Sequence, residues 1–79
     1  MKITITNQAR IDFNIPHTDL VRLEVYNISG MMICNLLNEQ MPAGLHTKYW
    51  NFYGIPPGVY LFRLMSGGEI LVQKGIIIE

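Results

Sequence analysis

The segment Asn51-Phe-Tyr-Gly-Ile-Pro-Pro-Gly58-Val-Tyr-Leu-Phe-Arg-Leu64 decides the fold, because a turn rich in proline and glycine runs straight into a strictly alternating strand. Successive side chains of a strand point to opposite faces of its sheet. Arg63 marks the outer face of the strand that we expect over residues 59–65. The core-facing side chains of this strand are therefore expected to be Tyr60, Phe62 and Leu64.

The same alternation recurs along the rest of the chain, and no segment shows a helical period over a useful length. Further strands are predicted at residues 2–6, 9–15, 20–26, 31–37, 45–50 and 70–78. Within the third of these, Arg22, Glu24 and Tyr26 are expected to point outward, and Val21, Leu23 and Val25 inward. Short strands separated by turns about every 8–12 residues predict an all-β, Ig-like antiparallel sandwich of about seven strands.

Turn-forming residues separate the predicted strands. Asn27-Ile-Ser-Gly30 fits a type I turn closed by a left-handed glycine, which also explains why these residues match a glycosylation acceptor. Pro42-Ala-Gly44 fits a turn with proline at its second position. Pro57-Gly58 fits the centre of a type II turn, in which Gly58 takes a positive φ, and Ser66-Gly-Gly-Glu69 fits a tight hairpin.

Composition limits the possible functions. The 79 residues are expected to form one domain. Because 49% of the residues are apolar and only 15% are charged, we expect some apolar surface to meet a partner. Six basic and six acidic residues cancel, which argues against nucleic-acid binding. No apolar run is long enough for a membrane-spanning helix. Residues 1–6 do not form a signal peptide, so an exported parent protein would carry its signal upstream.

Residues with chemical potential occur in no catalytic or metal-binding motif; they are Ser29, Ser66, Cys34, His17, Asp19 and His46. Cys34 is the only cysteine, and we expect it to be a buried, inert thiol. The sequence therefore predicts neither an enzyme nor a cofactor nor a metal site.

Aromatic residues cluster around the end of the fifth predicted strand, at Tyr49, Trp50, Phe52 and Tyr53. They are compatible with a sugar-binding platform. The favoured interpretation is structural, because a large ring at a strand end fills the core of a small sandwich and no carboxylate stands nearby to bind sugar hydroxyls. We therefore expect Trp50, Tyr60 and Phe62 to share one core.

Several segments in this order resemble the C-terminal sorting domains of the type IX secretion system: residues 10–16, 21–30, 42–46, Trp50, residues 58–60, residues 63–64 and residues 74–78. A related Ig-like module occurs in flagellar hook-capping proteins. Lys48 departs from the pattern, since the family usually has an apolar residue there, and the facing of residues 45–51 stays open. Glu79 departs from the basic residue that often ends the family.

The resemblance implies that the domain is the C-terminal module of a larger secreted protein. It would direct upstream cargo through the periplasm and the outer-membrane machinery of a Bacteroidetes-type bacterium to the cell surface, where a sortase acts. The alternative is an Ig-like spacer or assembly module. The resemblance implies a recognition strand of Lys74, Gly75, Ile76, Ile77 and Ile78. The structural motif residues that it implies are Gly30, Gly44, His46, Trp50, Gly58, Tyr60 and Phe62.

Overall fold

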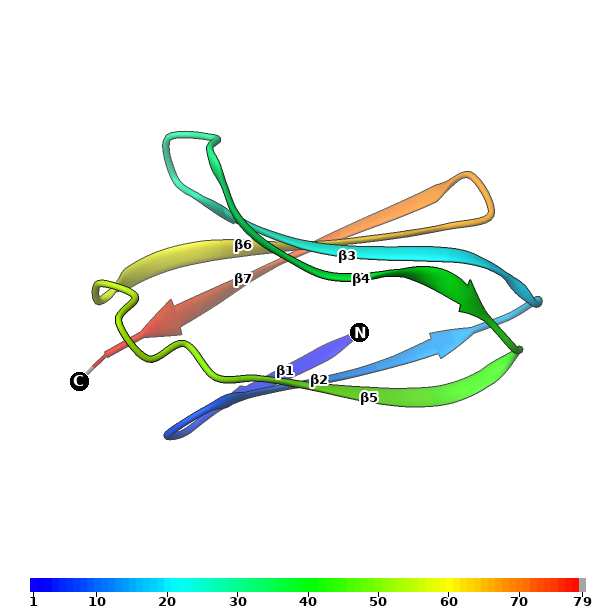
Figure 1. Cartoon of the computed structure of the whole chain (residues 1–79), viewed down its shortest axis with the longest axis horizontal. Coiled ribbons are helices and arrows are strands. Elements are labelled where there is room, and N and C mark those ends of the chain that lie inside the picture. Colours follow the sequence, from blue (N-terminus) through cyan, green and yellow to red (C-terminus); the bar gives the residue numbers. More distant parts are fainter. Residues whose placement is uncertain (79) are drawn as a thin grey trace.

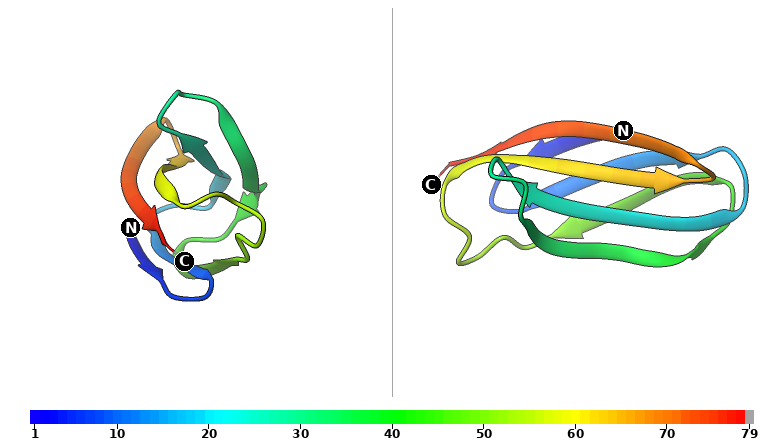
Figure 2. Two further views of the ribbon diagram at one scale, coloured as in Figure 1. Left: turned by 90° about the vertical axis from the view of Figure 1, so that its left-hand side faces the viewer. Right: turned by 90° about the horizontal axis from the view of Figure 1, so that it is seen from above.

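The computed structural model describes residues 1–78, which form seven antiparallel β-strands in two packed sheets (Figures 1 and 2). The small sheet has the order β1-β2-β5 and the large sheet the order β4-β3-β6-β7. The strands are β1 (Lys2–Ile5), β2 (Ala9–Ile15), β3 (Asp19–Asn27), β4 (Met32–Met41), β5 (Gly44–Trp50), β6 (Gly58–Ser66) and β7 (Glu69–Ile77). The predicted all-β sandwich of about seven strands is confirmed. Glu79 lies outside the described residues.

Alternation explains why these segments form strands that bury one face each. In β2 the residues at every second position are buried, and in β6 the buried residues are the predicted Tyr60, Phe62 and Leu64. The core between the sheets consists of these and the other buried apolar residues: Ala9, Ile11, Phe13, Ile15, Val21, Leu23, Val25, Leu37, Trp50, Tyr60, Phe62, Leu64 and Ile77.

Phe62 lies at the centre of the aromatic packing. Its ring meets the Trp50 ring edge to face, with centroids 5.9 Å apart and planes at 74°. Trp50 in turn packs edge to face on Phe52 at 6.0 Å. Tyr60 is also buried, and its hydroxyl donates a 2.6 Å hydrogen bond to the carbonyl oxygen of Pro56. The three predicted core aromatics thus lie in one core, and Tyr60 ties the loop before β6 to that core.

The turn before β6 differs from the prediction. Gly58 has the predicted positive φ, but its value of 158° lies far from the roughly 80° of a type II turn, and Gly58 pairs with Ile77 as the first residue of β6. The tight turn lies earlier, where the Ile55 N–H donates a 2.9 Å hydrogen bond to the Phe52 carbonyl oxygen and Gly54 has a φ of 85°. The ladder with β7 requires an extended backbone at Gly58, so the prediction of a type II turn centred there was wrong.

The edge strand β4 also differs from the prediction, and the edge strand β5 answers a question that the sequence left open. β4 runs on to Met41, four residues beyond the predicted end at position 37, because it pairs with β3 along the polar residues that hide its alternation. Cys34, on this edge strand, is half-buried and not fully buried as expected. On β5 the core-facing residues are His46, Lys48 and Trp50. Lys48 is half-buried, which an edge strand permits because an apolar lysine stem can cover the core while the ammonium reaches water.

Gly75 on β7 is the position where a side chain would not fit. An added Cβ would lie 2.7 Å from Cε1 of Phe62 and 3.1 Å from Cδ1 of Ile5. Gly75 is buried opposite Tyr60 in the β6–β7 ladder, so the missing side chain makes room for the Phe62 ring and for Ile5 of the other sheet. Gly75 therefore sets how closely the two sheets approach at this edge.

We predict that Trp50→Ala lowers the free energy of unfolding by about 3–5 kcal/mol, since truncating a buried aromatic leaves a cavity. That is a large part of the stability of a small domain. Urea unfolding of the purified domain measures it. Tyr53→Ala is the control, because Tyr53 is exposed at a loop tip and its loss is expected to change stability by less than about 0.5 kcal/mol. Equal unfolding free energies for the two variants would contradict the core role of Trp50.

We also predict that Gly75→Val destabilises the domain by about 1–3 kcal/mol, because the added side chain must displace Phe62 or Ile5. The control is Lys74→Val, which places the same side chain on the neighbouring, exposed position of β7. Thermal unfolding compares the two variants. A melting temperature for Gly75→Val equal to that of Lys74→Val would show that the glycine is not needed.

Candidate functional site

The outer face of the large sheet carries several exposed apolar side chains. Residues paired across neighbouring strands point to the same face, so the register defines which side chains lie there. On β7 they are Ile70, Val72, Lys74 and Ile76; on β6 they are Val59, Leu61, Arg63 and Met65; on β3 they are Leu20, Arg22, Glu24 and Tyr26. Among these, Val72 is 58% exposed and Ile76 is 55% exposed.

A buried carboxylate lies in the middle of this outer face. Glu24 points outward as predicted, yet it is only 1% exposed because neighbouring side chains cover it. Arg22 Nη2 donates a 2.8 Å hydrogen bond to Glu24 Oε2, and the Tyr26 hydroxyl donates a 2.8 Å bond to Oε1. Nη1 of Arg63 lies 3.9 Å from the same Oε1. Alternation predicts the direction of a side chain but not its burial by neighbours on the same face.

The outer face carries an excess of positive charge. Its cations are Lys74, Arg63 and Arg22 and its only carboxylate among the described residues is Glu24, which leaves a net charge of +2 on a chain whose formal net charge is zero. Among residues 1–78, Lys74 forms no ion pair. Its neighbours along β7 on the same face are Val72 and Ile76. The face is therefore both apolar and cationic.

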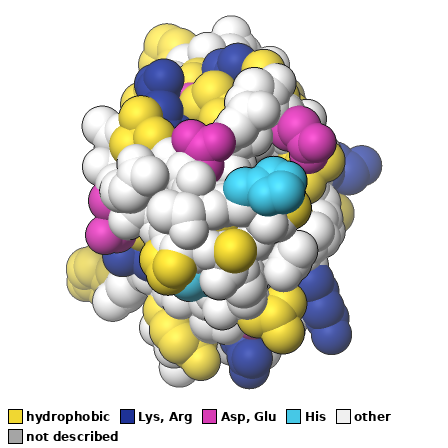
Figure 3. All heavy atoms as spheres, turned by 90° about the vertical axis from the view of Figure 1, so that its right-hand side faces the viewer, with side chains coloured by type: hydrophobic (Ala, Val, Ile, Leu, Met, Phe, Trp, Pro, Cys, Tyr) yellow, Lys and Arg dark blue, Asp and Glu magenta, His cyan; other side chains and the backbone are white. Residues whose placement is uncertain are grey.

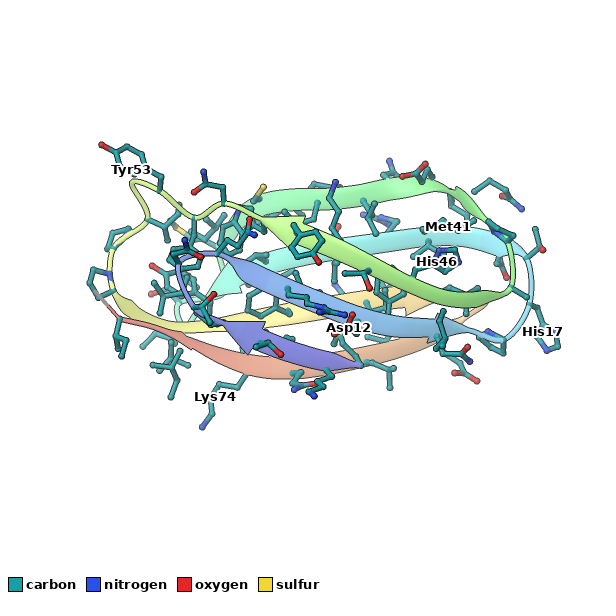
Figure 4. All side chains as sticks on the ribbon, turned by 90° about the horizontal axis from the view of Figure 1, so that it is seen from below. Asp12, His17, Met41, His46, Tyr53 and Lys74 are labelled. Atoms are coloured by element: carbon teal, nitrogen blue, oxygen red, sulfur yellow. The ribbon has the colours of Figure 1, made fainter. Side chains whose placement is uncertain are left out.

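The outer face of the small sheet has a different chemistry. Asp12 on β2 accepts a 2.7 Å hydrogen bond from the Thr47 hydroxyl and a 3.1 Å bond from Arg10 Nε (Figure 4 shows Asp12 on this face). The Thr47 hydrogen bond, followed by Arg10 and Lys2, holds the pKa of Asp12 below its ordinary value, and burial opposes them. Asp12 in turn raises the pKa of Arg10. Asp12 is therefore paired with donors from its own face.

One end of the sandwich holds a groove of about 500 Å³ between the β1–β2 turn, the β5–β6 loop and the end of β7. The described residues that line it are Thr6, Asn7, residues 51–55, Ile77 and Ile78. None of them carries a carboxylate, imidazole, amine or thiol. This groove has the character of an apolar recess with amide edges.

The aromatic residues near Trp50 do not share one surface. Trp50 faces the core, whereas Tyr49 is 53% exposed on the outer face of β5. Tyr53 projects from the loop at the end of the molecule (Figure 4). The four rings of the cluster point in different directions, so they do not form the flat platform that stacks on a sugar.

The candidate metal ligands of the sequence are also separated. His17 projects from the loop at one end, apart from His46 (Figure 4), and His46 stacks on Phe13 with ring centroids 5.7 Å apart. Because a carbonyl oxygen can only accept, Nε2 of His46 donates the 2.7 Å hydrogen bond to Pro42. Within residues 1–78, no three His, Cys, Asp or Glu side chains are gathered in a way that could hold a metal ion.

The same end of the sandwich, formed by the β2–β3, β4–β5 and β6–β7 turns, shows charged and hydrophobic side chains scattered without a patch of one sign (Figure 3). Asp19 in this region accepts a 2.7 Å hydrogen bond from the Leu20 N–H through its own Oδ1. In the described part of the chain, no helix has the length and hydrophobicity to cross a bilayer.

The predicted recognition strand has two kinds of position. Lys74, Ile76 and Ile78 are exposed, whereas Gly75 and Ile77 are buried in the core. Ile70 and Val72 lie outside the predicted recognition strand of residues 74–78, but they share the outer face with Lys74 and Ile76. Every second residue of a strand faces the same side, so counting in twos from Lys74 identifies Ile70, Val72 and Ile76 as its neighbours on that face.

A family model described as the secretion system C-terminal sorting domain matches residues 5–79. The chain belongs to this family. It is a C-terminal sorting domain of type IX secretion, which addresses cargo of Bacteroidetes-type bacteria for secretion or the cell surface. This sorting domain has no match among curated proteins or solved structures.

Sorting domains of this family interact with the type IX machinery and with a cargo domain, and the family is in general non-catalytic. Of the two functions considered from the sequence, the family match supports the secretion address. The spacer module is not what the family model describes.

We predict that Thr47→Val raises the pKa of Asp12 toward its ordinary value, because the largest contribution to its lowering is the Thr47 hydrogen bond. A carboxylate whose folded pKa is lowered contributes stability that is complete above the unfolded-state pKa of about 3.9 and is lost as the pH falls through the folded pKa. The variant should therefore lose this contribution at a higher pH. NMR titration of the Asp12 carboxyl measures the shift. Thr4→Val, on the same face, leaves both donors to Asp12 in place and should not change the titration.

Proposed function

We propose that the outward-facing residues of β7 are the part of the sorting domain that the export machinery reads. The observation that carries this proposal is the exposure of Val72 and Ile76, each more than half accessible, on the edge strand of the large sheet. Folded monomeric domains seldom leave a contiguous apolar strip uncovered unless it meets a partner.

The two edges of the large sheet support this choice of strand. β4 pairs with β3 through two register irregularities, which twist an edge and discourage contact with other proteins. β7 pairs with β6 in one regular register from Glu69 to Ile77 and carries no such interruption. The long, regular and apolar edge is the one suited to docking.

The recognition strand that the sequence suggests divides into two roles under this proposal. Lys74, Ile76 and Ile78 belong to the surface that is read, together with Ile70 and Val72. Gly75 and Ile77 act through the fold, because one makes room for Phe62 and the other fills the core. The domain itself performs no catalysis. It stands at the C-terminal end of a larger secreted protein, and a surface sortase acts on that protein after export.

The test is secretion of a fluorescent reporter fused to the domain in a bacterium with the type IX system. Val72→Ser/Ile76→Ser removes two exposed apolar side chains from β7, and we expect secretion to fall about tenfold or more because most binding energy of an interface comes from a few residues. The matched control is Leu45→Ser/Tyr49→Ser, which removes two exposed apolar side chains from the outer face of the small sheet and should leave secretion unchanged.

Thermal unfolding of both purified variants confirms that they fold. Deleting residues 75–79 is unsuitable as a test, because it removes Ile77 from the core along with the exposed positions. Equal secretion of the β7 variant and the intact fusion would contradict the proposed role of β7.

A further inference from the structure

We infer that the partner of the outer face of the large sheet is a protein surface that presents carboxylates around an apolar centre. The inference rests on the proposed function, since it specifies the chemistry of the partner that reads β7. It is carried by the combination on one face of exposed aliphatic side chains and a net charge of +2.

The two arginines of this face are held near Glu24. Arg22 is bound to Glu24 at 2.8 Å, and Arg63 lies within 3.9 Å of the same carboxylate. A guanidinium has five N–H donors, and one shared carboxylate with two oxygens cannot satisfy the donors of two arginines. The side chains of Arg22 and Arg63 are 46% and 37% exposed, so the remaining donors are accessible from the surface.

Docking of any partner on the apolar residues would also cover these cations. Covering a charge without a partner costs free energy, because the charge loses its hydration. A partner that carries carboxylates compensates this cost and is steered toward the face by its charge, whereas a neutral or cationic partner is not. Lys74 lies between Val72 and Ile76 on β7. A partner that covers these two apolar side chains therefore also covers the Lys74 ammonium, and a carboxylate is needed at that point to offset its lost hydration.

A membrane fits this face less well than a protein. Peripheral proteins that insert into the interface usually use tryptophan or phenylalanine, and adsorption to anionic lipid takes a cluster of about four to eight basic residues. The outer face has neither, since its apolar positions are mainly aliphatic and it has three cations around one carboxylate. A second copy of the domain fits less well too, because two such faces would oppose like charges.

The experiment starts with the Lys74→Glu fusion, which exchanges the one cation of the face that has no ion pair among residues 1–78. Lys2→Glu is the control, because Lys2 is exposed on the small sheet and undergoes the same change of charge. We expect Lys74→Glu to lower secretion about tenfold and Lys2→Glu to leave it near the level of the intact fusion. Melting temperatures of both purified domains verify that the fold is kept.

The partner is then identified by photo-cross-linking. Benzoylphenylalanine replaces Val72 in the fusion, and mass spectrometry of the cross-linked product from living cells identifies the contacted segment. We expect a protein segment with Asp or Glu next to the cross-link, and we expect exchange of those residues for Lys to restore secretion of the Lys74→Glu fusion.

Each alternative has its own outcome. A cross-link to lipid would favour the membrane, and a cross-link between two fusions would favour self-association; either would overturn the inference. Normal secretion of Lys74→Glu, combined with loss of secretion in Val72→Ser/Ile76→Ser, would overturn the acidic partner and leave the proposed function standing. If both variants are secreted normally, the proposed function itself fails.

Discussion

The packing of Phe62 is the constraint on which the rest of the sandwich depends. The ring is fully buried and packs edge to face with Trp50 of the small sheet. On the neighbouring strand, it occupies the space that a side chain at Gly75 would need. A large ring at this position determines that β7 must have a glycine opposite Tyr60 and that Ile5 of β1 can approach the same place. The strands nearest the two chain ends, β1 and β7, thus come together next to the Phe62 side chain.

The carboxylates of the two outer faces pair with their neighbours in different ways. On the small sheet, Asp12 accepts hydrogen bonds from Arg10 and Thr47 of its own face. On the large sheet, Glu24 draws two arginines inward and still leaves an excess of positive charge among aliphatic side chains. A chain with no net charge thus has one outer face with an excess of positive charge.

Much of the fold follows from the sequence, because a period of two specifies both a strand and the direction of its side chains. The buried positions of β2 and β6 were predictable for this reason. The length of β4 was not, since an edge strand tolerates polar residues on both faces, and the turn before β6 was not, since strand pairing overrides the preference of Pro57-Gly58.

The candidate site was predictable in part. The apolar strand after Gly68 is visible in the sequence, and alternation counted from Lys74 places Ile76 on the outer face, in agreement with the register with β6. The burial of Glu24 and the inward direction of Lys48 depend on neighbours from other strands, which local patterns do not contain. Residues distant in sequence thus decide the features that composition and alternation leave open.

The burial of Ile77, near the end of β7, has a consequence for biosynthesis. Ile77 is a buried residue near the C-terminal end of the domain, and the ribosome adds it after the other strands are complete. A nascent chain that breaks off before Ile77 has an unfilled core. The folded domain is therefore complete only after translation has reached the end of β7.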